Sequence, residues 1–348
     1  MIEGDAKKLI QAAIDESVSD IHILPTKEQY VIHFRANGRL MLFEEKSLEW
    51  GKRLISHFKY LANMDVGEKR RPQSGSTAIE LETEAVELRF STITNVLLLE
   101  SMVIRVLQTQ KFDRDQVVTY FPQDIDELRK LTKRKSGLIL FSGPVGSGKT
   151  TTIYQLLREL IQHESLQIIT MEDPVEIFEE RFLQTEVNEK AGITYDLLIK
   201  SSLRHHPDVL MIGEIRDQET ARMAIRGALT GHLMIATIHA KNTRGVIARL
   251  QELSISDEQL RQTLIGVISQ RLVPSAIQKD TQYSRAAIFE ILAKGALNGV
   301  LHNNHTLSQY DTLNEKLRKA WVYGYIDEAT YTKFEIFNRH KDTKGLTS

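Results

Sequence analysis

The chain has 348 residues, and its contents of 41% apolar and 26% charged residues are typical of folded globular proteins rather than disordered ones. Its 45 lysines and arginines balance 46 acidic residues, so no overall positive charge attracts nucleic acid or anionic lipid. The absence of cysteine excludes disulfides and thiolate metal sites. No apolar run approaches the roughly 18 residues of a transmembrane helix, and the start lacks a signal peptide's apolar core, so we expect a cytoplasmic protein without a transmembrane segment.

The length favours two domains, and the first third of the chain is typical of a small α+β domain. Apolar residues recur at helical spacing over residues 5–18, and Leu54 and Phe58 indicate a second helix. Asn37-Gly38 indicates a hairpin turn. The strand-like runs cover residues 21–25, 30–43, 76–82, 86–93 and 101–107.

We expect this α+β domain to occupy residues 1–108, with a linker over 109–122 and a second domain over 123–348. From Gly137 onward strands and helices alternate, which is typical of an α/β domain with a mostly parallel sheet. The strand at 138–141 leads into GPVGSGKT, which has the spacing of a P-loop between a strand and a helix, as a P-loop requires.

A loop of this kind binds phosphate because its glycines let successive backbone amides curl around an anion, and the next helix adds partial positive charge. We expect Lys149 to reach the β- and γ-phosphates of ATP and the Thr150 hydroxyl to hold Mg²⁺. The predicted nucleotide-binding residues are Gly143, Pro144, Val145, Gly146, Ser147, Gly148, Lys149, Thr150 and Thr151.

The segment HPDVLMIGEIRD holds a buried strand with an acid at each end, Asp208 and Glu214, while Gly213 stands where magnesium-binding strands usually carry aspartate. Ligands of a parallel sheet bind at the carboxyl ends of its strands. A strand rises about 3.3 Å per residue, so Asp208 lies roughly 20 Å from Glu214 and cannot reach the same phosphate. We therefore predict that Glu214 activates or orients the attacking water and assists the metal indirectly, while Asp208 serves structure.

Two further side chains follow strand ends at the same edge of the sheet. Glu172 ends the strand that begins at Gln167, and His239 follows the strand 233–238, where it could polarise the γ-phosphate. His232 lies at the other end of that strand, roughly 23 Å before His239, so both a catalytic and a structural role stay open for it.

Three stretches in order match a known family of motors. ITMEDPVE (169–176), LRHHPDVLMIGEIRD (203–217) and TGHLMIATIHAKNT (230–243) resemble the acidic box, modified Walker B strand and histidine box of PilT/GspE-like traffic ATPases. These ATPases serve type II secretion, type IV pili and DNA uptake. The resemblance runs from about Ser19 to Leu292, and it implies a RecA-like P-loop NTPase core preceded by a smaller, PAS-like α+β domain.

The resemblance also implies a homohexameric ring that hydrolyses ATP with Mg²⁺ at the cytoplasmic face of the cell membrane. Its expected partners are a polytopic inner-membrane platform protein and a pseudopilin system. By motif, catalytic weight falls on Glu172, Glu214 and both histidines, and Arg105 and Arg89 would close on the phosphates as arginine fingers do in other NTPases.

Departures from the common family pattern narrow the resemblance. The chain has RRPQSG at 70–75, and it has neither a four-cysteine zinc insertion nor a long additional amino-terminal domain. In these three features it most resembles the competence ATPases of Gram-positive bacteria. A type II secretion or pilus-retraction ATPase is the alternative. A hexameric nucleic-acid translocase is disfavoured because the neutral charge argues against a direct grip on DNA.

Overall fold

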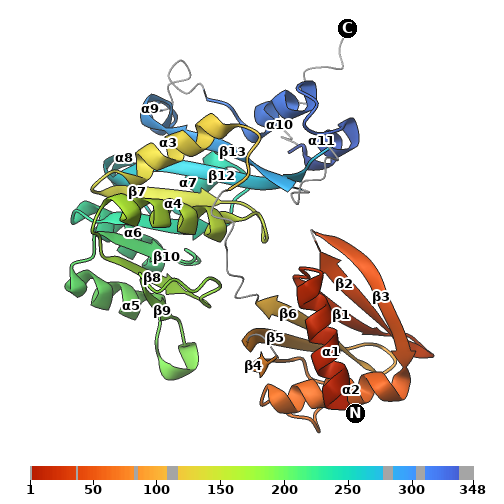
Figure 1. The fold of residues 1–348 in the computed structure, drawn as a ribbon. Helices are drawn as coiled ribbons and strands as arrows, with labels where there is room; N and C mark the ends of the chain where they lie inside the picture. Colours follow the sequence, from red (N-terminus) through yellow and green to blue (C-terminus); the bar gives the residue numbers. More distant parts are fainter. Residues whose placement is uncertain are drawn as a thin grey trace. The chain divides into compact units, whose positions relative to one another are not determined.

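The structure is a computed structural model that describes residues 2–36, 38–81, 85–107, 117–276, 285–302 and 310–336. The chain divides into two compact units, Met1–Asp113 and Arg114–Ser348 (Figure 1). Most of the expected linker over 109–122 lies outside the described residues, as does Asn37 of the predicted hairpin turn. Among the described residues, no helix has the length and apolar content that crossing a membrane requires.

The described part of the amino-terminal unit is an antiparallel six-stranded sheet, in the order β3-β2-β1-β6-β5-β4, packed against two helices. Its elements are α1 (Ile2–Asp15), β1 (Asp20–Pro25), β2 (Gln29–Ala36), β3 (Arg39–Ser47), α2 (Leu48–Leu61), β4 (Gln73–Glu80), β5 (Ala85–Thr94) and β6 (Glu100–Leu107). This is the predicted order of helices and strands. Burial alternates along β5, where Leu88 and Phe90 are buried in the core with Phe58 of α2, while the alternate residue Arg89 is only partly buried.

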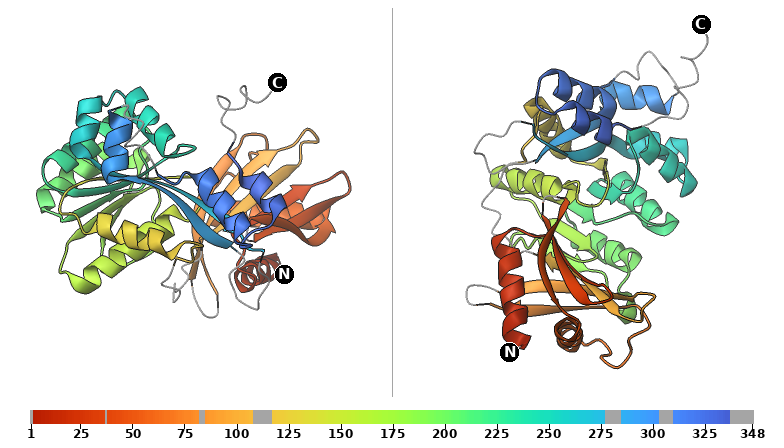
Figure 2. Two further views of the ribbon diagram at one scale, coloured as in Figure 1. Left: turned by 90° about the horizontal axis from the view of Figure 1, so that it is seen from above. Right: turned by 90° about the vertical axis from the view of Figure 1, so that its right-hand side faces the viewer.

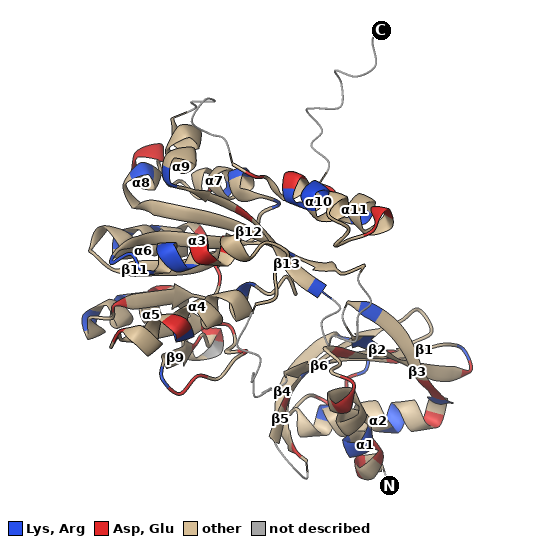
Figure 3. Ribbon diagram, turned by 45° about the horizontal axis from the view of Figure 1, so that its top comes forward, with Lys and Arg blue, Asp and Glu red and all other residues tan. Residues whose placement is uncertain are grey.

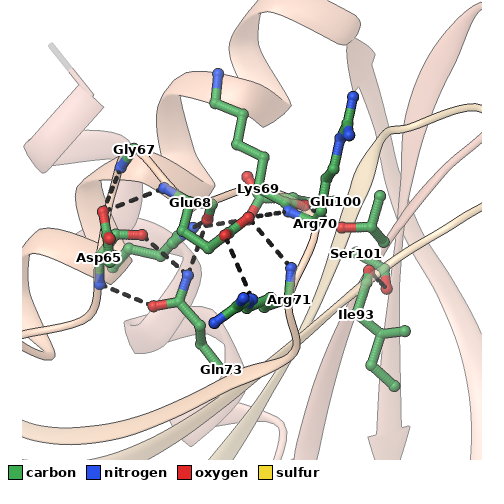
Figure 4. A network of polar contacts seen from close by, with 12 residues as sticks. Asp65, Gly67, Glu68, Lys69, Arg70, Arg71, Gln73, Ile93, Glu100 and Ser101 are labelled. Carbon is green, nitrogen blue, oxygen red and sulfur yellow. Dashed lines mark hydrogen bonds and ion pairs between the residues drawn. The ribbon is translucent and has the colours of Figure 1, made fainter.

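A buried ion pair joins α2 to β6 in this unit. The Lys59 side chain has no solvent exposure, and its Nζ donates to Glu100 Oε1 at 2.7 Å and to the backbone oxygen of Glu68 at 2.6 Å. The Glu68 carboxylate accepts hydrogen bonds from the backbone N–H groups of Arg70 and Arg71, which fixes the loop before β4 (Figure 4). The buried Lys59 charge therefore connects helix α2 to strand β6 and to the loop before β4.

Replacing Glu100 with Gln should destabilise the amino-terminal unit by about 3–5 kcal/mol, because the Lys59 charge would stay buried without its carboxylate partner. Urea unfolding followed by circular dichroism measures this loss. Glu80→Gln, at an exposed position of β4, is the control and should change the free energy of unfolding by no more than about 0.5 kcal/mol. Equal stability of the two variants would show that the pair has no such role.

The second unit contains a seven-stranded sheet in the order β13-β12-β7-β11-β10-β8-β9. The strands from β12 to β9 are parallel, as the alternating pattern predicted, and β13 is an antiparallel edge strand. The strands are β7 (Gly137–Ser142), β8 (Ile168–Glu172), β9 (Leu183–Glu186), β10 (Val209–Ile212), β11 (Leu233–Ile238), β12 (Leu264–Pro274) and β13 (Arg285–Ala293). The central strands β7, β10 and β11 are buried at every residue, which explains their uninterrupted apolar runs.

Helices cover both faces of this sheet, with α3 and α4 on one face and α6 to α9 on the other (Figure 2). The helices are α3 (Pro122–Thr132), α4 (Lys149–His163), α5 (Tyr195–Ser202), α6 (Gln218–Leu229), α7 (Thr243–Glu252), α8 (Asp257–Thr263), α9 (Lys294–Leu301), α10 (Leu313–Val322) and α11 (Glu328–Phe334). Leu313 and Leu317 of α10 pack on Ile288 of β13, so the carboxyl-terminal helices form a cap on the edge of the sheet. The parallel strands all end on the same side of the sheet, and the candidate site lies at these carboxyl ends.

Candidate functional site

The P-loop lies between the buried strand β7 and helix α4. Gly148 caps α4 in the left-handed conformation, with φ of 81°. Gly143 has φ of 149°, and a Cβ there would lie 2.5 Å from the Gln270 carbonyl oxygen, so no other residue fits without a backbone shift. Lys149 Nζ donates to the carbonyl oxygens of Gly143 at 3.0 Å and Pro144 at 3.1 Å. The sequence therefore builds a tight loop with one lysine held at its mouth.

A cavity of about 400 Å³ opens beside this loop. Its lining includes residues 145–151 of the predicted nucleotide-binding set together with Glu172, Glu214 and His239. Gly143 and Pro144 do not line it but hold Lys149 through their carbonyl groups. The ends of β8, β10 and β11 and the P-loop thus meet at one cavity.

Both carboxylate oxygens of Glu214 have partners. Arg216 Nε donates to Oε2 at 2.7 Å, and His239 Nε2 lies 3.0 Å from Oε1. Arg216 also donates through Nη1 to Asp173 Oδ2 at 2.9 Å, and its hydrogen bond to Glu214 raises the pKa of the guanidinium. A carboxylate with a partner on each oxygen is better suited to orienting a water molecule than to accepting its proton.

Glu172 is held differently. Thr170 Oγ1 donates to its Oε1 at 2.7 Å and the Tyr154 hydroxyl donates to the same oxygen, while no described residue hydrogen-bonds Oε2. Burial raises the pKa of the Glu172 carboxyl, and the bonds from Tyr154 and Thr170 oppose that rise. Glu172 thus keeps one carboxylate oxygen without a hydrogen bond from another described residue, whereas both oxygens of Glu214 have partners.

Gly213, at the usual aspartate position, has little space for a side chain. Its N–H donates to the Met171 carbonyl oxygen at 2.7 Å, and a Cβ there would lie 3.0 Å from Tyr195 Oη and 3.2 Å from Glu172 Cα. At the opposite end of the strand, Asp208 Oδ2 accepts from the backbone N–H of Gln167 at 2.8 Å, which is the predicted structural role. The usual aspartate position therefore contributes no acid to the site, and the acidic groups come from Glu172 and Glu214.

Three predicted catalytic residues do not line this cavity. His232 precedes β11 at the opposite end from His239, and its Nδ1 lies 3.1 Å from Thr230 Oγ1. Arg89 and Arg105 lie opposite each other on β5 and β6 of the amino-terminal unit, and Arg105 Nε donates to Asp20 Oδ1 at 3.0 Å. Their action on phosphate stays a prediction.

The cavity also contains residues to which the sequence analysis gave no role. Arg216, Tyr195 and Arg285 line it, and burial lowers the pKa of Arg285. Arg216 could have been predicted to line the cavity, because it follows Glu214 by only two residues. Arg285 reaches the cavity from the antiparallel edge strand, and nothing in its local sequence indicates that.

The chain belongs to the family of type II/IV secretion system proteins, whose model matches residues 1–320. It is similar to Competence protein ComGA of Halalkalibacterium halodurans (42% identity over 94% of this chain and 97% of the relative) and of Bacillus subtilis (39% over 96% and 98%). It shares 38% identity with the Type II secretion system ATPase E of Vibrio cholerae, over 78% of this chain and 55% of that one. Among solved structures, the pilus retraction motor PilT with bound ADP matches with a TM-score of 0.70 and 27% identity, over 95% of this chain and 97% of that one. The chain is therefore a P-loop ATPase of the secretion and pilus type.

Proposed function

We propose that this chain is the ATPase motor of a type IV pilus-like competence pseudopilus that takes up DNA. The ComGA proteins of Halalkalibacterium halodurans and Bacillus subtilis are matched over 97% and 98% of their lengths, whereas the Type II secretion system ATPase E of Vibrio cholerae and the Type II secretion system protein E of Xanthomonas campestris are covered over 55% and 47% of theirs. The observation that carries the motor chemistry is the meeting of Lys149, Glu172, Glu214 and His239 at one cavity.

ATP would bind with its phosphates in the P-loop. Ser147 Oγ is buried and has no hydrogen-bond partner among the described residues, so it is available to a phosphate oxygen. Burial lowers the pKa of Lys149, and the negative charge of a bound phosphate would oppose that shift and favour the charged lysine. Thr150 would hold Mg²⁺, which neutralises charge on the phosphate oxygens when bound. The glycine-rich P-loop is therefore suited to the phosphates of ATP, and Thr150 supplies a hydroxyl oxygen for Mg²⁺.

Hydrolysis requires one oriented water molecule and one proton acceptor. Glu214, fixed by Arg216 and His239, orients the water toward the γ-phosphorus. Glu172 accepts the water proton on Oε2 while the bond from the γ-phosphorus to the bridging oxygen breaks, giving ADP and phosphate. Lys149 balances the charge on the transferred group.

The working assembly is a homohexamer with a RecA-like core in each subunit. The amino-terminal unit is a PAS-like module, joined by the linker over 109–122, and it brings Arg105 and Arg89 onto the phosphates when ATP binds. For His232, which lies at the opposite end of β11 from the cavity, a catalytic and a structural role both stay open. The ring lies at the cytoplasmic face of the membrane and acts on a polytopic platform protein and its pseudopilins.

A hexameric nucleic-acid translocase is the second candidate, and it requires a basic surface. Basic and acidic residues are interspersed over both units (Figure 3), and the chain carries a net charge of −1, which favours the pseudopilus motor. In a host strain lacking the gene, the parent chain should restore pseudopili and transformation, and Glu214→Gln should restore neither. Normal transformation in the deletion strain, or turnover that depends on added DNA, would refute the proposal.

A further inference from the structure

We infer that Tyr154 and Gln184 form a positioning relay that fixes the Glu172 carboxylate in the lining of the cavity and keeps it ionised. The inference rests on the proposed role of Glu172 as proton acceptor. The three residues lie on three elements, α4, β9 and β8, and Tyr154 comes one helical turn after Thr150 of the P-loop. The relay therefore links the phosphate-binding helix to the acid that acts on the water.

The direction of each hydrogen bond is fixed, beginning at Gln184. Gln184 Oε1 accepts the backbone N–H of Glu179 at 2.8 Å, so its Nε2 must be the donor on the other side. Nε2 donates to the Ile177 carbonyl oxygen and to Tyr154 Oη, both at 2.7 Å. Tyr154 Oη accepts this bond and donates its single proton to Glu172 Oε1, because an ionised carboxylate can only accept.

The surroundings keep this proton on the tyrosine. Tyr154 is 1% exposed, and its ring centroid lies 5.5 Å from that of Phe182. Burial and the neighbouring Glu172 charge raise the pKa of Tyr154 far above its ordinary value, so the hydroxyl keeps its proton and can donate it. A permanent donor on Oε1 favours the ionised carboxylate and leaves Oε2 as its only free acceptor.

If Tyr154 only filled space in the core, its replacement would change catalysis in a different way from the loss of a hydrogen-bond donor. In Tyr154→Phe the ring stays and only the donor is lost, so burial acts on Glu172 with less opposition and the pKa of Glu172 rises further. A base is inactive once protonated, and activity is lost as pH falls through its pKa. The acid limb of the kcat–pH profile should therefore move to higher pH, whereas a general loosening would lower kcat equally at all pH values.

The test measures kcat and KM for ATP across pH with the full-length chain. Tyr154→Phe should move the acid limb of kcat to higher pH by about one pH unit, keep the kcat reached at alkaline pH and leave KM unchanged. Gln184→Leu should shift the acid limb in the same direction by a smaller amount, because the hydroxyl loses the group that orients it. Tyr120→Phe is the matched control: its hydroxyl donates to the Val273 carbonyl oxygen at 3.1 Å and does not line the cavity.

An acid limb in Tyr154→Phe and Gln184→Leu that coincides with that of Tyr120→Phe would overturn the relay. Glu172→Gln separates this failure from a failure of the proposed mechanism. If Glu172→Gln turns over normally, Glu172 is not the proton acceptor and both proposals fall. If Glu172→Gln is inactive while the acid limb of Tyr154→Phe does not move, only the relay is wrong.

Discussion

Replacing Glu214 with Gln should leave ATP binding intact and lower turnover about 100-fold or more. Glutamine has the same size and can still accept the hydrogen bond from Arg216, so the cavity keeps its shape. It loses the negative charge that orients the attacking water in the proposed mechanism and that lies 3.0 Å from His239 Nε2. Phosphate release at saturating ATP measures turnover, and titration with a fluorescent ATP analogue measures binding.

Asp208→Asn is the matched control for this variant. Asp208 lies at the opposite end of β10, where its carboxylate accepts a backbone hydrogen bond from Gln167, and asparagine can accept the same bond. Its turnover should stay within about twofold of the parent chain. Equal turnover of Glu214→Gln and Asp208→Asn would remove Glu214 from the mechanism.

Replacing Lys149 with Ala should weaken ATP binding about 100-fold or more, because the loop loses the cation that reaches two phosphate groups. The lysine is held at the mouth of the loop by the carbonyl oxygens of Gly143 and Pro144. Isothermal titration with ATP and Mg²⁺ measures the change in Kd.

Lys133→Ala removes an exposed charge at the end of α3 and should leave the Kd for ATP unaltered. Circular dichroism of both variants checks that each folds. If Lys149→Ala binds ATP as tightly as Lys133→Ala, the P-loop lysine does not contact the phosphates.

The parts of the site that depend on strand ends were predictable from the sequence. Apolar runs of strand length mark where β8, β10 and β11 stop, and a parallel sheet brings those ends to one edge. This is why Glu172, Glu214 and His239 were expected together, and the structure places all three in the lining of one cavity. It also explains why His232, one strand length away, lies outside that lining.

The contacts that position these groups were not predictable. Tyr154 and Gln184 are 30 residues apart, and their hydrogen bond depends on β9, a short, partly exposed edge strand without an apolar pattern. The close approach at Gly213 was also hidden, because it depends on the backbone of the neighbouring strand at Met171. Side-chain geometry between distant segments carries no local sequence signal.

The most direct test of the account is a crystal structure of the chain with Mg²⁺ and a non-hydrolysable ATP analogue. We expect the terminal phosphate beside Lys149, with Glu214 and Glu172 Oε2 both within hydrogen-bond reach of one water in line with the γ-phosphorus. A structure in which residue 214 lies far from that phosphate, with a different acid beside it, would contradict the central claim that these strand ends form the catalytic site.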